Sequence, residues 1–90
     1  MSFEVIFSPK SNRQIRSLDE KLKEKVKKAI VEIGNDPWHR GTIKVKGYEN
    51  IRRKRAGNYR ILYTIDKQRN EVLVVKIERR SETTYKPAKT

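Results

Sequence analysis

The sequence contains no cysteine and only one histidine, and its four glycines are dispersed. The lack of cysteine excludes disulfides and thiolate metal sites, and fits an intracellular protein. The single histidine, His39, follows Pro37 and Trp38 in a loop and is best explained by a structural role, which disfavours Ser-His-Asp catalysis. Because the acidic residues are scattered and the glycines form no phosphate-binding loop, we expect no metal and no other cofactor.

Long hydrophobic runs are also missing. The N-terminal MSFEVIFSPK holds an apolar stretch that is too short for a signal peptide or a transmembrane segment. We therefore expect a soluble cytoplasmic protein with no membrane partner. Ninety residues suffice for one hydrophobic core, which predicts a single domain over residues 1–90 with a polar tail at residues 81–90.

Negative charge is scarce relative to positive charge. The chain has 23 Lys and Arg against 11 Asp and Glu, which gives a net charge of +12 and an isoelectric point of about 10.2. So much positive charge repels itself unless an anion binds it. Nucleic acid, an anionic membrane and an acidic protein are the classes of partner that this charge allows.

The apolar spacing predicts a strand followed by two helices. Residues 3–7 (FEVIF) have the composition of a strand, and Ser8 and Pro9 then provide an N-cap and a first residue for a short helix. Ser17 and Glu20 have the spacing of a capping box at the start of a second helix. That helix carries an apolar stripe at steps of three and four residues, formed by Leu18, Leu22, Val26, Ala29, Ile30 and Ile33.

After the stop signal at Gly34–Pro37 the apolar period changes to that of strands. Gly57-Asn58 has the composition of a tight hairpin turn between two of these strands. The order of elements predicts an α+β fold in which two N-terminal helices pack on one face of a mostly antiparallel sheet. Four strands are expected: TIKVKG (42–47), NIRRKRAG (50–57), NYRILYTI (58–65) and EVLVVKIERR (71–80).

Cations concentrate in the middle of the chain, where residues 40–60 hold eight Lys or Arg and one acid. Arg53 and Arg55 alternate along one strand and therefore share a face, and Arg60 lies in the next strand. Arg79 extends the line of apolar residues in the last strand. Protection of a sheet edge needs only one or two charges, so a phosphate-binding surface explains this cluster better.

Cleavage of RNA without a metal suits such a surface. RNA carries its own nucleophile, the 2′-OH, so the protein needs only to align it, move protons and stabilise the phosphorane with fixed cations. A tyrosine near arginines is a candidate for proton transfer. Tyr85 follows Arg79 and Arg80, although packing of its ring on the protein body explains its position equally well.

The ordered motifs resemble the RelE/ParE toxin superfamily, and its RelE branch in particular. RAGNYRILY (55–63) matches the family core R-x-G-[DN]-Y-R-[hydrophobic]-x-Y, and KVKG (44–47) and the basic tail with its tyrosine support it. The resemblance implies a fold like that of small microbial ribonucleases and metal-free cleavage of mRNA in the ribosomal A site. It also implies a RelB-like antitoxin that wraps the toxin in a heterodimer or heterotetramer.

By position, the resemblance assigns the transition-state role to Arg60. It matches Arg79 to the arginine of the last strand and Tyr85 to the C-terminal tyrosine near the 2′-OH. The two basic positions of the preceding strand correspond to Arg53 and Arg55, where the best-known members have lysines. These five residues are the expected catalytic set.

Arginine stays protonated and is a poor group for proton transfer at neutral pH. Either Tyr85 therefore acts as the base, or the register slips by one residue and Lys54 enters the site. Flanking mRNA or ribosomal RNA is expected to bind a further set of cations, consisting of Lys44, Lys46, Arg52, Lys54 and Arg80.

Two other functions fit parts of the pattern. One is a ParE-like inhibitor of DNA gyrase that cuts nothing, although such members generally lack the arginine and tyrosine set. The other is a basic nucleic-acid-binding relative with weak or no catalysis. Cleavage products and gyrase arrest distinguish the three functions.

Overall fold

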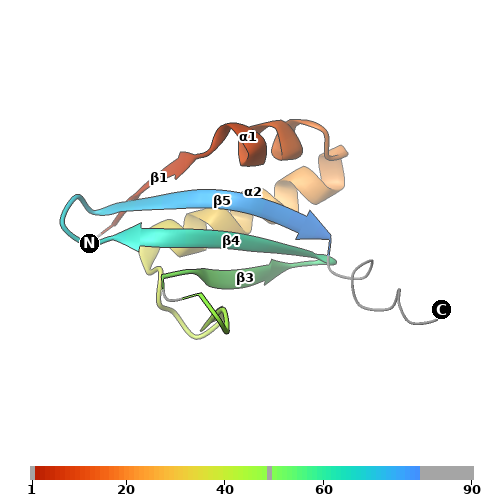
Figure 1. The fold of residues 1–90 in the computed structure, drawn as a ribbon. Coiled ribbons are helices and arrows are strands. Elements are labelled where there is room, and N and C mark those ends of the chain that lie inside the picture. The colour runs from red at the N-terminus through yellow and green to blue at the C-terminus, as the bar shows by residue number, and fades with distance from the viewer. Residues whose placement is uncertain (1, 49, 80–90) are drawn as a thin grey trace.

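The computed structural model describes residues 2–48 and 50–79. Two helices and five strands follow one another in the order expected from the sequence (Figure 1). Their bounds are β1 (Glu4–Phe7), α1 (Pro9–Arg16), α2 (Glu20–Asn35), β2 (Thr42–Lys44), β3 (Arg52–Ala56), β4 (Tyr59–Asp66) and β5 (Glu71–Arg79).

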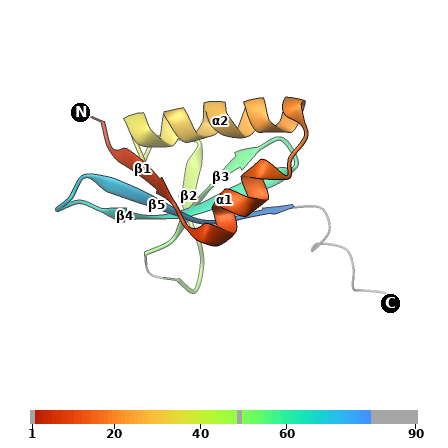
Figure 2. The same ribbon diagram turned by 90° about the horizontal axis from the view of Figure 1, so that it is seen from above.

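The strands form one sheet in the order β1-β5-β4-β3-β2. β1 pairs with β5 in parallel, and the other three pairings are antiparallel. The predicted α+β fold, with two helices on a mostly antiparallel sheet, is confirmed. Figure 2 shows α2 above one face of the sheet and α1 close to β5, while the opposite face carries no described helix.

Both helix starts are capped, but only one as expected. Ser8 Oγ accepts a hydrogen bond from the Ser11 amide at 3.1 Å, and Pro9 occupies the first helical position. The predicted capping box at Ser17 is wrong, because Asp19 caps α2 by accepting from the Leu22 amide at 3.0 Å. Ser17 instead ends α1, where its hydroxyl donates to the Gln14 carbonyl. A carboxylate two residues later serves as the cap equally well.

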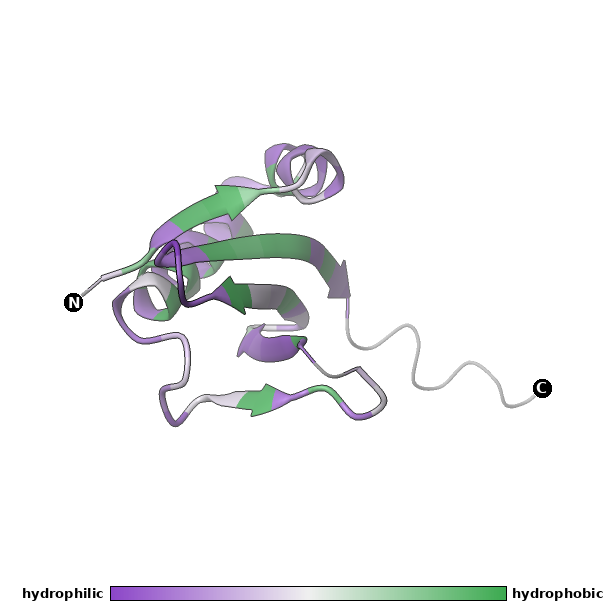
Figure 3. Cartoon of the chain, turned by 60° about the vertical axis from the view of Figure 1, so that its left-hand side comes forward, coloured by the Kyte–Doolittle hydropathy of each residue, from purple (hydrophilic) through white to green (hydrophobic). Residues whose placement is uncertain are grey.

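The core lies between α2 and the sheet. It is built from one face of α2 and the inward residues of the three central strands, namely Val26, Ala29, Ile30, Ile33, Ala56, Ile61, Tyr63, Val72, Val74 and Ile77. Figure 3 shows hydrophobic colour along β1 and most of β5, and hydrophilic colour along most of β3. The cationic strand is therefore part of the sheet without contributing much to its apolar centre.

The helix α2 ends at Asn35, within the predicted stop at Gly34–Pro37, and Gly34 itself lies in the last turn, where it allows close packing. A Cβ at this position would lie 3.3 Å from both the Phe3 carbonyl oxygen and Val5 Cγ2. The Phe3 amide also donates to the Gly34 carbonyl at 2.8 Å, which brings the start of the chain onto the end of the helix.

Two local features set the alignment of the central strands. The predicted turn at Gly57-Asn58 is confirmed, since β3 ends at Ala56, β4 begins at Tyr59 and Gly57 has a φ of +63° that favours glycine. Between β4 and β5 the pairing shifts at Leu62/Tyr63. This bulge leaves one extra residue in β5, so the faces of β5 exchange at that point.

Candidate nucleic-acid interface

Charged side chains from three strands gather on the face of the sheet opposite α2. Residues directly opposite each other in antiparallel strands point to the same face. The pairing places Arg55 opposite Arg60 and Arg60 opposite Glu78, and in the next row it places Leu62 between Arg53 and Lys76. We call these six residues the open-face grid: Arg53, Arg55, Arg60, Leu62, Lys76 and Glu78.

The grid holds four cations and one carboxylate. Arg60 Nη2 lies 3.2 Å from Glu78 Oε2, and Lys76 Nζ lies 3.2 Å from Glu78 Oε1. The Arg60 side chain is only 21% exposed, and its buried Nε has no hydrogen-bond partner among the described residues. Three of the predicted catalytic arginines, Arg53, Arg55 and Arg60, are thus brought together on one face.

A hollow of about 270 Å³ adjoins the grid on the side of β2. Arg53 and Arg55 line it together with Ile43, which pairs with Arg53, and Arg40 adds a further cation from the preceding loop. An anionic strand that lay over this face would therefore meet cations from the loop before β2 as well as from three strands of the sheet.

Arg79 lies on the other side of the sheet from this grid. Its register partner is Tyr59, and Ile77, two residues earlier, is buried in the core. Arg79 continues the line of Ile77, as expected, but not that of Leu73, because the bulge in β5 reverses the faces between Val74 and Lys76. Arg79 lines a hollow at the end of β5 beside α1, together with Lys76 and Glu78 of the grid.

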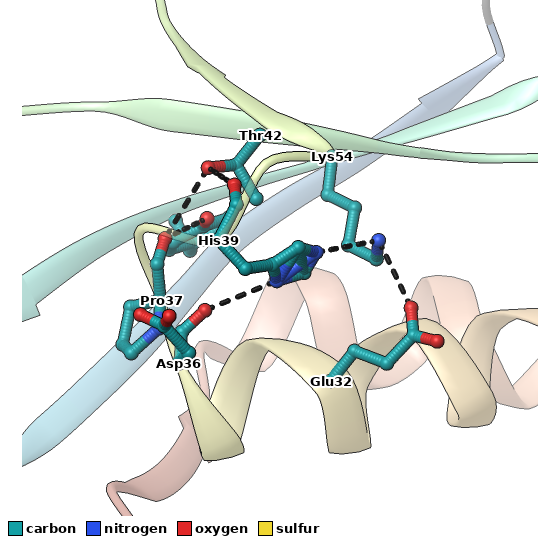
Figure 4. Close-up of polar contacts among 7 residues, drawn as sticks. Glu32, Asp36, Pro37, His39, Thr42 and Lys54 are labelled. Atoms are coloured by element: carbon teal, nitrogen blue, oxygen red, sulfur yellow. Dashed lines mark hydrogen bonds and ion pairs between the residues drawn. The ribbon is translucent and has the colours of Figure 1, made fainter.

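Lys54 also faces away from the grid, since it lies between Arg53 and Arg55 in the strand. Its ammonium is 3.0 Å from Glu32 Oε1 on α2 and 2.9 Å from His39 Nε2 (Figure 4). The alternative in which a shifted register brings Lys54 into the site does not fit this arrangement. Its predicted contact with RNA does not fit either, because the residue is 9% exposed.

The tautomer of His39 follows from its partners. The Asp36 carbonyl only accepts a hydrogen bond, so Nδ1, 3.1 Å away, carries the proton. The Lys54 ammonium only donates, so Nε2 is unprotonated. With these two hydrogen bonds His39 ties the loop after α2 to β3, which agrees with the structural role predicted for it.

Two other predicted RNA contacts lie at a hollow of about 250 Å³ that contains Trp38. Lys44 and Arg52 line it together with Lys67, whose ammonium lies 5.7 Å from the centre of the Trp38 ring. Arg52 donates to the Thr42 hydroxyl and carbonyl, which holds its guanidinium at the edge of the sheet.

The remaining predicted site residues lie elsewhere. Lys46 lies in the loop after β2, beside Gly47, whose φ is +89°. Arg80 and Tyr85 lie outside the described residues. Within the described part of the chain, no group of three or more His, Asp or Glu side chains is arranged to hold a metal ion, and no helix is long and apolar enough to cross a membrane.

Sequence reasoning missed Lys76 and Glu78. Their alternation with Ile77 was visible, but nothing in the sequence locates the extra residue that turns them toward Arg60. Without the register of β5 against β4, the residue types alone do not show that Glu78 lies opposite Arg60.

Residues 5–84 match the family model described as the ParE toxin of the type II toxin–antitoxin system parDE. The chain belongs to the RelE/ParE toxin superfamily. No curated protein matches the chain significantly.

Solved structures of toxins show the same fold. A chain of the archaeal RelE–RelB complex from Pyrococcus horikoshii OT3 superposes with a TM-score of 0.78 at 20% identity, covering 91% of this chain and 99% of that one. A chain of the RelBE2 complex from Mycobacterium tuberculosis has a TM-score of 0.78 at 22% identity, and the match covers 89% of this chain and 100% of that one. The isolated E. coli RelE toxin has a TM-score of 0.78 at 22% identity, and the match covers 91% of this chain and 90% of that one. This member of the superfamily therefore has the RelE-like toxin fold.

Proposed function

We propose that this chain is the toxin of a type II toxin–antitoxin system and a ribosome-dependent endoribonuclease. It cleaves mRNA in the A site by attack of the 2′-OH on the adjacent phosphate, without a metal, in the cytoplasm. The observation that carries the proposal is the open-face grid, in which four cations from three strands converge on the face of the sheet opposite α2.

The arginines of the grid are assigned to the phosphate. Arg60 stabilises the phosphorane, because a guanidinium held in a partly buried site stabilises developing negative charge most effectively. Arg53 and Arg55 hold the scissile phosphate from the neighbouring strand. Tyr85 is proposed as a proton-transfer group and Arg79 as a further contact to the scissile phosphate, both on the strength of the resemblance. Arg80 is proposed as a contact to the flanking RNA.

The RNA on either side of the cleaved bond is assigned to cations outside the grid. Lys44 and Arg52 at the Trp38 hollow, and Lys46 in the loop after β2, contact phosphates. These contacts position the strand without reading its sequence, so their strength falls as salt increases.

Primer extension on an mRNA translated in vitro tests the proposal. We expect cuts at the A-site codon only when ribosomes are present, and loss of the cuts in Arg60→Ala while ribosome binding changes little. Equal loss of binding and cleavage would make Arg60 a docking contact. Tyr85→Phe, measured in parallel, is expected to slow cleavage, and a cleavage rate equal to that of the wild type would remove Tyr85 from the mechanism.

We propose a RelB-like antitoxin as the cognate partner, in a heterodimer or heterotetramer. Similar solved chains come from RelE–RelB complexes, and the net charge of +12 calls for an acidic covering surface. Because an antitoxin binds only the folded toxin, it raises the melting temperature. An unchanged melting temperature at saturating antitoxin would contradict this.

Inhibition of DNA gyrase is the second candidate, because the matching family model is described as a ParE toxin. It predicts arrest of gyrase supercoiling and no mRNA cleavage. Supercoiling assays with wild type and Arg60→Ala, run beside the translation assay, separate the two functions. A protein that binds many nucleic acids but neither cuts mRNA nor arrests gyrase would be a basic binding relative.

A further inference from the structure

We propose that Glu78 is a catalytic residue that accepts the proton of the attacking 2′-OH. The inference rests on the proposed ribonuclease function and adds a residue that the sequence motif does not indicate. It follows from the position of the carboxylate among the cations of the open-face grid.

The reaction needs a group that takes a proton at neutral pH. Arginine and lysine side chains are protonated there and only donate, so the four cations of the grid do not serve. Glu78 supplies the one carboxylate in the two rows. The nearest acids on β4 and on the start of β5, Asp66 and Glu71, pair with each other at the opposite end of these strands.

Glu78 is held where such a base is needed. It lies directly across from Arg60, to which the proposed function assigns the phosphorane, and its two oxygens contact different cations. When a phosphate engages Arg60, Lys76 still holds the other carboxylate oxygen in place. The side chain is 24% exposed, so a ligand on this face has partial access to it.

The proton balance is complete with groups that are present. As Glu78 takes the 2′-OH proton, the bond between O2′ and phosphorus forms and the bond from phosphorus to the 5′-oxygen breaks. The departing 5′-oxygen takes a proton from water or from Tyr85, the proton-transfer group of the proposed function, and Glu78 later returns its proton to the solvent. The products are a 2′,3′-cyclic phosphate and a 5′-hydroxyl.

The competing explanation is that Glu78 takes no part in proton transfer. In that case it only neutralises Arg60 through the ion pair until RNA displaces it. The two explanations predict opposite results for Glu78→Gln. An amide keeps the size of the side chain but does not accept a proton, so a base is lost. If Glu78 only forms an ion pair, Glu78→Gln removes the negative charge and frees Arg60 for RNA, so cleavage is unchanged or faster.

The test measures single-turnover cleavage on programmed ribosomes at pH 7, at saturating toxin, for wild type, Glu78→Gln and Glu78→Asp. General base catalysis typically contributes about 10²–10⁴-fold. We expect Glu78→Gln to slow cleavage by roughly 100-fold or more. Glu78→Asp, which keeps a carboxylate but withdraws it from Arg60, is expected to cleave more slowly than wild type and faster than Glu78→Gln. Glu71→Gln, at the far end of β5, is the matched control and cleaves like wild type.

Binding is measured separately, with mRNA that carries a 2′-deoxy nucleotide at the cleaved position. We expect Glu78→Gln to bind this ribosome complex at least as tightly as wild type. Cleavage by Glu78→Gln within about threefold of wild type would overturn the role of Glu78 while the ribonuclease function stands. Absence of cleavage by folded, ribosome-bound wild type would overturn the ribonuclease function itself. If Glu78→Gln does not fold, cleavage by Glu78→Asp as fast as that by Glu71→Gln would overturn the proposal, and slower cleavage at unchanged ribosome binding would support it.

Discussion

Lys54 and Glu32 form an ion pair between the cationic strand β3 and helix α2, with 3.0 Å between Nζ and Oε1. The neighbours of Lys54 in the strand, Arg53 and Arg55, point the other way because side chains alternate along a strand. One cation of the run therefore fastens the strand to the helix layer, while the cations on either side of it face outward.

Replacement of Lys54 by Met is expected to lower the free energy of unfolding at pH 7. We also expect that this free energy then decreases less as the pH is lowered. The hydrogen bond and charge of Lys54 hold the pKa of Glu32 below its usual value of 4.5. A depressed carboxylate pKa stabilises the fold above that value, and this stabilisation is lost as the pH falls through the pKa of the folded state. Urea denaturation at pH 7 and in acid measures both effects. Lys27→Met, which removes an exposed charge from α2, is the control, and equal acid dependence in the two variants would contradict the prediction.

Tyr63→Phe is expected to lower the free energy of unfolding by about 1–3 kcal/mol. The buried Tyr63 hydroxyl donates to the Pro37 carbonyl at 2.6 Å and so joins β4 to the loop after α2. Tyr48→Phe, at an exposed position, is the control and should change stability by less than about 0.5 kcal/mol. Equal stabilities of the two variants would show that the hydrogen bond contributes nothing.

Burial also raises the pKa of Tyr63 above its usual value of 10.0. A raised pKa contributes stability that is complete below the usual value and is lost as the pH rises through the pKa of the folded state. We expect a spectroscopic titration to show the Tyr63 phenolate forming last among the tyrosines, together with unfolding. If the Tyr63→Phe variant lost an early-titrating tyrosine instead, the burial argument would fail.

Gly34→Ala is expected to be neutral or destabilising, although alanine usually stabilises a helix interior by about 1 kcal/mol over glycine. The added Cβ would lie 3.3 Å from the Phe3 carbonyl oxygen, and the Phe3 amide is itself bonded to Gly34. The backbone of β1 therefore has little room to move away. Gly34→Val, which adds two more carbons, should destabilise further. If thermal melts showed that Gly34→Ala stabilises the protein by the full value of about 1 kcal/mol, the backbone of β1 would have to move away from the added Cβ without cost.

Arg53→Gln combined with Arg55→Gln is expected to reduce the salt dependence of RNA binding. Each phosphate contact on a single strand contributes about 0.7 to the slope of log K against log salt, so loss of two contacts should lower the slope by roughly 1.4. Titration of a fluorescent single-stranded RNA at several salt concentrations measures this. Lys27→Gln combined with Lys10→Gln removes the same charge from the helices. An equal change in slope in that control would mean that net charge, and not the open-face grid, governs binding.

The order and type of the elements followed from the sequence because they depend on local patterns. The apolar stripe of α2 and the glycine turn between β3 and β4 each require only neighbouring residues to be read correctly. The start of α2 was misplaced because Ser17 and Asp19 are both good caps, and in the structure Ser17 ends α1 while Asp19 caps α2.

The sequence by itself determined the fold class, the concentration of positive charge and the pairing of Arg53 with Arg55 on one face, since alternation and composition need no long-range information. The tertiary structure decided which cations meet. The bulge in β5 turned Arg79 toward the helices and Glu78 toward Arg60, and the approach of α2 and of the loop after it gave Lys54, on the opposite face, its partners Glu32 and His39. Such choices depend on the alignment of strands distant in the sequence, where a shift of one residue exchanges the two faces of a sheet.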